Sequence, residues 1–304
     1  MTQRLILHIG HPKTGTTTLQ KTLQASRTAL INAGILHPDT GHHHNHRALI
    51  PYLTSEASAL QQLDSSPSEV LKISSKKWNA VKEEVSTLNP NTIILSSESF
   101  FRDLGDDEFR MLGSNLKSLA SKIVIAAYLR EPASLTLSKA QQNIKRKPIF
   151  TLPPKAYYRS TLELYKNSGI GSMKVRIFDR RALEDGDIVK DFFAQHIPHF
   201  DPERLSRSKD DNTSFSAKAM SLLQEVQRKE RSCPRDNAKH AIKKADRELH
   251  GFARPRMHDQ ICHAIQALCT DLGWLKDEFD LEFPNIDTTA MSHSEADRLC
   301  DALD

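Results

Sequence analysis

The chain has 304 residues, of which 38% are hydrophobic and 26% are charged, and its formal net charge is +4. A chain of this length and composition is expected to fold as one globular domain, with a substantial addition at most. Its apolar runs are shorter than the roughly 18 residues needed to span a bilayer, and the N-terminal run LILHIG is too short for the core of a signal peptide. We therefore expect no membrane span, a cytoplasmic protein and, because the net charge is low, no nucleic-acid partner.

Four continuous apolar runs have the composition of buried parallel strands, at 4–10, 92–97, 123–130 and 173–179. Between them the apolar residues recur at helical spacing, which predicts helices at 16–33, 48–62, 75–88, 107–120, 132–146, 155–167 and 187–196. This alternation predicts an α/β fold with a short parallel sheet and helices on both faces. The segments 34–47 and 147–154 are rich in Gly, Pro or His and are expected to be irregular.

Beyond residue 200 only helical patterns occur, at 215–231, 237–250, 257–272 and 293–303. We expect residues 1–200 to form the α/β core and 201–304 to form a helical cap of the same domain. Between Arg204 and Arg256 basic side chains outnumber acidic ones by about two to one, which suits either a solvated helix face or a rim that attracts a polyanion. The four cysteines have no C-x-x-C spacing and are expected to be reduced, mostly buried thiols: Cys233, Cys262, Cys269 and Cys300.

The segment LHIGHPKTGTTTLQ, residues 7–20, begins as a buried strand and ends as the first turn of a helix. A helix start leaves backbone N–H groups without partners and carries a partial positive charge, so a glycine-rich turn at this junction is expected to bind an anion. A nucleotide triphosphatase would have lysine directly after the second glycine. Here Thr16 stands at that position, and Lys13 lies inside the loop, where it can reach a bridging or leaving oxygen of a bound phosphate chain.

These residues resemble a family. HPKTGTTTLQ is similar to the 5'-phosphosulfate-binding loop, P-K-x-G-T-T-x-L, of sulfotransferases that use 3'-phosphoadenosine-5'-phosphosulfate (PAPS), with matches at Pro12, Lys13, Gly15, Thr16, Thr17 and Leu19. The resemblance implies a P-loop-type three-layer α/β/α fold. It also implies a cofactor loop that includes Thr14 and Thr18.

A second motif follows the strand predicted at 123–130. YLREPASLTLSKAQQ resembles the family's 3'-phosphate-binding pattern, R-[DE]-P-x-x-x-x-x-S, with Arg130, Pro132 and Ser138 in the required places. Arg130 would lie at the carboxyl end of a strand, where open α/β sheets bind ligands, and its guanidinium can bind a phosphate through two hydrogen bonds. Read without the family, Arg130 suits a pair with a neighbouring carboxylate and Ser138 suits an ordinary helix surface.

The resemblance implies transfer of a sulfuryl group from PAPS to a hydroxyl or amine of an acceptor, leaving 3',5'-ADP, with Lys13 stabilising the charge on the leaving oxygen and no metal required. The acceptor is expected to be a small hydroxylated metabolite or, preferably, a carbohydrate, distantly as in glycosaminoglycan sulfotransferases. Basic residues near the second motif, Lys139, Lys145, Arg146 and Lys147, suit an anionic acceptor or a solvated face equally well. The sequence does not predict an oligomeric state.

A general base is also needed to take the acceptor's proton. Glu98 follows the strand at 92–97 and should lie at the same sheet edge as Lys13 and Arg130, although a carboxylate at a helix start is its alternative role. The other candidates are His43, His44 and His46, of which His46 precedes the next helix and is preferred. A metal site at these histidines is disfavoured because adjacent side chains diverge.

Two other kinds of function stay open. A nucleotide kinase is disfavoured by Thr16 at the lysine position and by the lack of a matched magnesium-binding carboxylate. A non-catalytic nucleotide-binding module would keep the loop without the chemistry.

Overall fold

The fold is described from a computed structural model, which describes residues 4–41, 44–55, 66–144, 155–207, 215–230, 236–248 and 253–301. By its internal contacts the chain divides into two compact units. The first comprises Met1–Arg130 and Tyr158–Lys209, and the second comprises Glu131–Tyr157 and Asp210–Asp304. The segment after Arg130 thus groups with the C-terminal helices, whereas the sequence patterns place it in the core.

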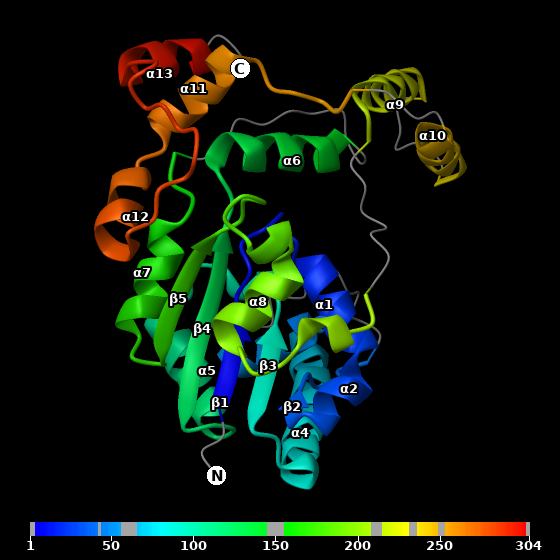
Figure 1. The fold of residues 1–304 in the computed structure, drawn as a ribbon, viewed down its shortest axis with the longest axis vertical. Coiled ribbons are helices and arrows are strands. Elements are labelled where there is room, and N and C mark those ends of the chain that lie inside the picture. The colour runs from blue at the N-terminus through cyan, green and yellow to red at the C-terminus, as the bar shows by residue number, and fades with distance from the viewer. Residues whose placement is uncertain are drawn as a thin grey trace. The chain divides into compact units, whose positions relative to one another are not determined.

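The first unit is built on a five-stranded sheet whose strands are all parallel, in the order β2-β3-β1-β4-β5 (Figure 1). The strands are β1 (Arg4–His8), β2 (Ile35–Leu36), β3 (Thr92–Ser96), β4 (Lys122–Leu129) and β5 (Ser172–Ile177). Their continuous apolar sequence fits strands that are covered on both faces. The α/β fold with a parallel sheet is therefore confirmed, and β2 is an addition to the predicted strands.

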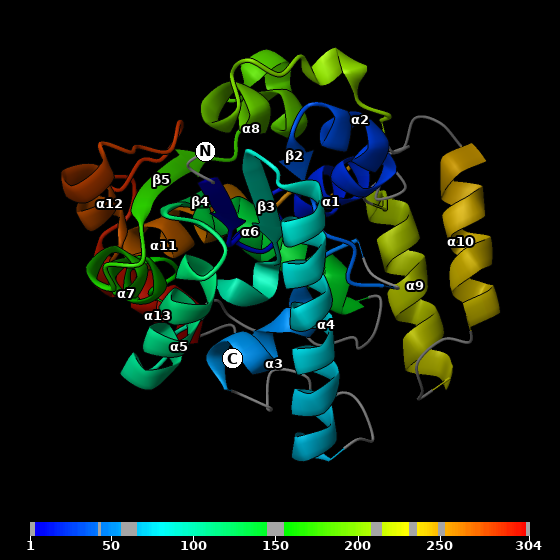
Figure 2. The same ribbon diagram turned by 90° about the horizontal axis from the view of Figure 1, so that it is seen from below.

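Helices cover both faces of the sheet, as Figure 2 shows by looking along it. On one face lie α1 (Thr16–Ala25), α2 (Arg27–Asn32) and α8 (Ile188–His196), which share a buried cluster with Ile6, Ile94 and Tyr128 of the strands. On the other face lie α3 (Ile50–Thr54), α4 (Pro67–Leu88) and α5 (Asp106–Lys117), while α7 (Arg159–Asn167) packs on β5. Three layers result, as the alternating pattern predicts.

A buried ion pair ties α8 to the edge of the sheet. Asp191 of α8 has a side chain that is 1% exposed and accepts two hydrogen bonds from the Arg176 guanidinium of β5, at 2.7 and 2.8 Å. The hydroxyl of Tyr128 in β4 donates to the same carboxylate at 2.8 Å. Because a buried carboxylate is stable only when its oxygens are bonded, this cluster fixes how α8 lies on the sheet.

The second unit contains α6 (Pro132–Ile144), α9 (Ala217–Glu230), α10 (Asp236–Glu248), α11 (Asp259–Leu268), α12 (Leu272–Phe279) and α13 (His293–Asp301). Leu223 of α9 and Ile242 of α10 belong to one apolar cluster, against which Ile144 of α6 packs. The helical character expected after residue 200 is found in the described part, and α12 is an element that the sequence patterns did not predict. No helix among the described residues is long and apolar enough to cross a bilayer.

The order of the strands sets where a ligand can bind. The chain leaves β1 toward β2 on one side of the sheet, returns through β3 and crosses to β4 on the other side. The carboxyl ends of β1 and β4 therefore flank a point where the connections diverge, which is the usual ligand position in such sheets. Lys13 follows β1, and Arg130 follows β4.

Candidate functional site

The turn between β1 and α1 has an unusual backbone. Gly10, Lys13 and Gly15 all have positive φ, at 32°, 67° and 72°. A Cβ atom on Gly15 would lie 3.0 Å from the Phe178 ring, and one on Gly10 would lie 2.5 Å from the methyl of Thr16. Glycine is thus required at both ends of the loop, whereas Lys13 adopts a left-handed conformation that is unfavourable for a residue with a side chain.

The start of α1 is suited to hold an anion. Its first helical hydrogen bond runs from the Leu19 N–H to the Gly15 carbonyl at 3.1 Å, so the amides of Thr16, Thr17 and Thr18 precede the regular pattern. Among the described residues no side chain caps this end, and the first turn contains no acidic residue. By contrast α8 starts with Asp187, whose carboxylate accepts from two backbone amides. The positive end of α1 is therefore not neutralised by an acidic residue of its own first turn.

The threonines of the loop have different roles. Thr14 is buried, and its hydroxyl donates to the His11 carbonyl at 2.6 Å, so this side chain shapes the loop. Thr16 is buried as well, and its hydroxyl donates to the carboxylate of Glu98. Pro12, Thr17 and Thr18 are half-buried on the loop and the first helical turn.

Glu98 lies beside this loop. β1 and β3 are paired in register, with His8 opposite Ser96, and Glu98 begins a 3-10 helix two residues beyond β3. The residue is exposed, and its carboxylate accepts the hydrogen bond from Thr16. The structure thus brings one predicted cofactor residue and one predicted base into direct contact.

His46 does not suit the role of general base. It is 1% exposed, its Nδ1 accepts from the Ser96 amide at 2.9 Å, and its Nε2 therefore carries the hydrogen and donates to the Pro38 carbonyl at 2.9 Å. Burial lowers the pKa of this imidazole to about 4. Both nitrogens are used to hold the backbone, which argues against the predicted role. His44 is half-buried, and His43 lies outside the described residues.

A histidine that the sequence patterns did not single out lies under the loop. His8, the last residue of β1, is fully buried, and its Nδ1 is 2.8 Å from the Ser96 hydroxyl, which also accepts from Gln20 at 3.0 Å. Its Nε2 has no hydrogen-bond partner among the described residues and is close to Gly10. Burial lowers the pKa of His8 to about 4, so the ring supports the loop as a neutral group. A histidine inside an apolar strand gives no sequence signal for this position.

Arg130 reaches the loop from the neighbouring strand. Its Nη1 donates to the Lys13 carbonyl at 2.9 Å, and its guanidinium lies 6.0 Å from the centroid of the Phe178 ring. Its own carbonyl accepts from the Tyr158 hydroxyl at 2.6 Å. Lys13 and Arg130, which were predicted from separate motifs, are therefore directly bonded.

The rest of the second motif belongs to the second unit. Glu131 caps α6, because its carboxylate accepts from the amides of Ala133 at 2.9 Å and Ser134 at 2.6 Å. Pro132 begins this helix, where its missing N–H costs nothing. Ser138 is half-buried on α6, and its role toward a 3'-phosphate stays a prediction.

Other parts of the described chain offer no comparable arrangement. No group of three or more His, Cys, Asp or Glu side chains is placed to hold a metal ion within the described ranges. Cys262 and Cys269 are free thiols there, while Cys233 and the side chain of Cys300 lie outside the description.

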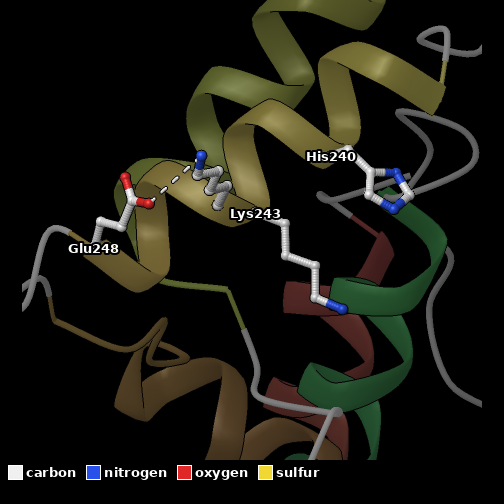
Figure 3. Close-up of a pocket in the computed structure, with 4 residues that line it drawn as sticks. His240, Lys243 and Glu248 are labelled. Atoms are coloured by element: carbon white, nitrogen blue, oxygen red, sulfur yellow. Dashed lines mark ion pairs between the residues drawn. The ribbon is translucent and has the colours of Figure 1, made fainter.

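Within the described residues, a hollow in the second unit is lined by four side chains of α10 (Figure 3): His240, Lys243, Lys244 and Glu248. Lys244 pairs with Glu248 at 3.9 Å, one turn along the helix, and Lys243 points away from Glu248. Both members of that pair are largely exposed, so the contact is a weak one. We therefore assign no chemistry to this hollow.

A scan against protein-family models finds no matching family, and searches of curated proteins and of solved structures find no significant similarity. The resemblance to sulfotransferases therefore rests on two short motifs, and the site is interpreted from its own geometry.

Proposed function

We propose that this protein is a PAPS-dependent sulfotransferase that acts on a hydroxyl or amine of an acceptor, with a carbohydrate as the preferred class. One observation carries the proposal. The uncapped start of α1 follows a loop whose lysine lies at its middle, and Glu98 contacts the same loop through Thr16. An anion site, a cation and an exposed carboxylate are the three groups that sulfuryl transfer without a metal needs.

In this proposal each group of residues has a separate role. The amides at the start of α1 and the hydroxyls of Thr16 and Thr17 bind the 5'-phosphosulfate, and Arg130 binds the 3'-phosphate. PAPS supplies the activated sulfuryl group: the acceptor oxygen or nitrogen bonds to sulfur as the bond to the phosphate oxygen breaks, and that oxygen keeps the electron pair. Lys13 stabilises the negative charge on this oxygen, and Glu98 takes the proton from the acceptor.

The Thr16–Glu98 bond gives the proposal a specific feature. The Thr16 hydroxyl donates to a carboxylate, which is an anion at the position where phosphosulfate oxygens are expected. Cofactor binding must therefore compete with Glu98 for this donor. The competition releases the carboxylate toward the acceptor when the cofactor is bound, which is when a base is needed.

Calorimetric titration with 3',5'-ADP and transfer from radiolabelled PAPS to a panel of glycans and small hydroxylated compounds test the proposal. The wild-type protein should bind 3',5'-ADP without added metal and label at least one acceptor. Lys13→Ala should lose transfer, whereas the matched control Lys72→Ala, at an exposed position of α4, should not. If Lys13→Ala leaves transfer unchanged, the role proposed for Lys13 is wrong.

A kinase is the second candidate, because a hydroxyl and a carboxylate in contact are also the oxygen ligands that Mg²⁺ uses with nucleotides. The same titration separates the two activities. Magnesium-dependent binding of ATP with no response to 3',5'-ADP would refute the sulfotransferase and support the kinase. Binding of 3',5'-ADP with no transfer to any acceptor would favour a non-catalytic module.

A further inference from the structure

Arg130 is hydrogen-bonded to the centre of the loop between β1 and α1. Its Nη1 donates to the Lys13 carbonyl at 2.9 Å, although 117 positions of the chain separate the two residues. Lys13 has φ of 67°, a conformation that residues with a side chain rarely adopt unless their surroundings impose it. The hydrogen bond from Arg130 is an interaction that imposes it.

Arg130 is held both at its guanidinium and at its backbone. The guanidinium lies over the Phe178 ring, and the same ring is within 3.0 Å of where a Cβ on Gly15 would lie. The backbone of Arg130 is fixed by the Tyr158 hydroxyl, which donates to its carbonyl at 2.6 Å. Phe178 therefore lies beside both the Arg130 guanidinium and the end of the loop at Gly15.

The bond also orients a peptide group. In a trans peptide the carbonyl of Lys13 and the N–H of Thr14 point in opposite directions. Because the carbonyl faces Arg130, the Thr14 amide faces away from it. The hydroxyl of Thr14 donates to the His11 carbonyl at 2.6 Å and fixes the other side of this peptide. The orientation of the Lys13–Thr14 peptide dipole thus depends on Arg130, which follows the neighbouring strand β4.

We infer that Arg130 is a positioning residue for the 5'-phosphosulfate loop, in addition to its proposed contact with the 3'-phosphate. It holds the Lys13–Thr14 peptide in the orientation that presents Lys13, so the two phosphate sites are coupled through one side chain. The inference rests on the proposed function for the choice of ligands, but the coupling itself is a property of the protein alone.

Two nucleotides that differ only by the 3'-phosphate separate the two roles of Arg130. In calorimetric titrations Arg130→Ala should weaken 5'-AMP binding at least fivefold, and 3',5'-ADP binding by more. Lys72→Ala, at an exposed position of α4, should change the binding of neither nucleotide. Arg130→Lys keeps the charge and one donor, so its losses should be intermediate for both nucleotides. If Arg130→Ala binds 5'-AMP within twofold of wild type, the positioning role is refuted.

Hydrogen–deuterium exchange of the peptide that covers residues 9–19, without nucleotide, gives a readout that does not depend on the proposed function. Arg130→Ala should raise exchange there, and Arg130→Lys should raise it less, with no change at the Lys72→Ala control. Unchanged exchange in Arg130→Ala would overturn the inference. If wild-type protein binds neither nucleotide but the exchange rises as expected, the proposed function fails and the coupling stands.

Discussion

Gly15→Ala tests whether the loop is held as tightly as the structure indicates. The substitution places a methyl group 3.0 Å from the Phe178 ring and 3.2 Å from Ile188, at a residue whose φ is 72°. A left-handed conformation costs an alanine about 1–2 kcal/mol. Crowding in a packed site costs about 1–3 kcal/mol more. We therefore expect the free energy of unfolding to fall by about 2–5 kcal/mol.

A second glycine separates the two contributions. Gly169 has φ of 64° but would place no Cβ within 4 Å of another atom, so Gly169→Ala should lose only the conformational part, about 1–2 kcal/mol. Urea unfolding followed by circular dichroism, with equal slopes for the three proteins, gives both differences. If Gly15→Ala loses no more stability than Gly169→Ala, the close packing of Phe178 under the loop is wrong.

Three further predictions concern charge and proton transfer. Glu98→Gln should tighten 3',5'-ADP binding a few-fold, because an anion beside Thr16 is removed, and should slow transfer by about 10²–10⁴; weaker nucleotide binding would contradict the competition for Thr16. Lys13→Gly should slow transfer by about 10²–10³ while unfolding in urea within about 1 kcal/mol of wild type, since glycine accepts positive φ; a large stability loss would show that the side chain is structural. The low pKa of His46, about 4, means that the folded state binds fewer protons than the unfolded state, so stability is full above pH about 6.5 and falls as the pH drops toward 4. His46→Gln should reduce the slope of unfolding free energy against pH between 6.5 and 4.5 by up to about 1.4 kcal/mol per pH unit, and an unchanged slope would contradict the neutral buried ring.

Much of the core was predictable because long apolar runs form its strands. β2 was not, since Ile35–Leu36 is too short to show a period of two. It exists because Ile35 pairs with Thr92 of β3 and because the preceding Gly34 carbonyl accepts from the amides of Asn91 and Thr92. The predicted helix 16–33 is divided at Ser26 into α1 and α2, where the backbone departs from helical geometry at ψ of 13°. Where a helix ends in this way depends on tertiary packing, which the spacing of apolar residues in the sequence does not predict.

In the candidate site, too, the sequence pattern predicts some positions and not others. The position of Glu98 follows from strand order, because residues after parallel strands meet at one sheet edge. The role of His46 could not be inferred in this way, since it depends on the amide and carbonyl of Ser96, fifty positions further along the chain. A histidine in a polar loop and a histidine that supports a strand end have the same sequence signal. Only the contacts of both ring nitrogens distinguish them.

The backbone conformation of Lys13 depends on a contact between the two sequence motifs, since Arg130 of the second motif donates to the carbonyl of Lys13 in the first. If the loop served only to bind an anion with its amides, glycine or asparagine would occupy the left-handed position at less cost. A lysine there is unfavourable for the backbone, which fits the proposed role of its side chain. Arg130 stabilises this backbone through the Lys13 carbonyl and therefore supports the residue that the proposed chemistry needs most. A strained residue held by a partner from another strand is typical of a functional position, where the surrounding structure imposes a conformation that the residue would not adopt by itself.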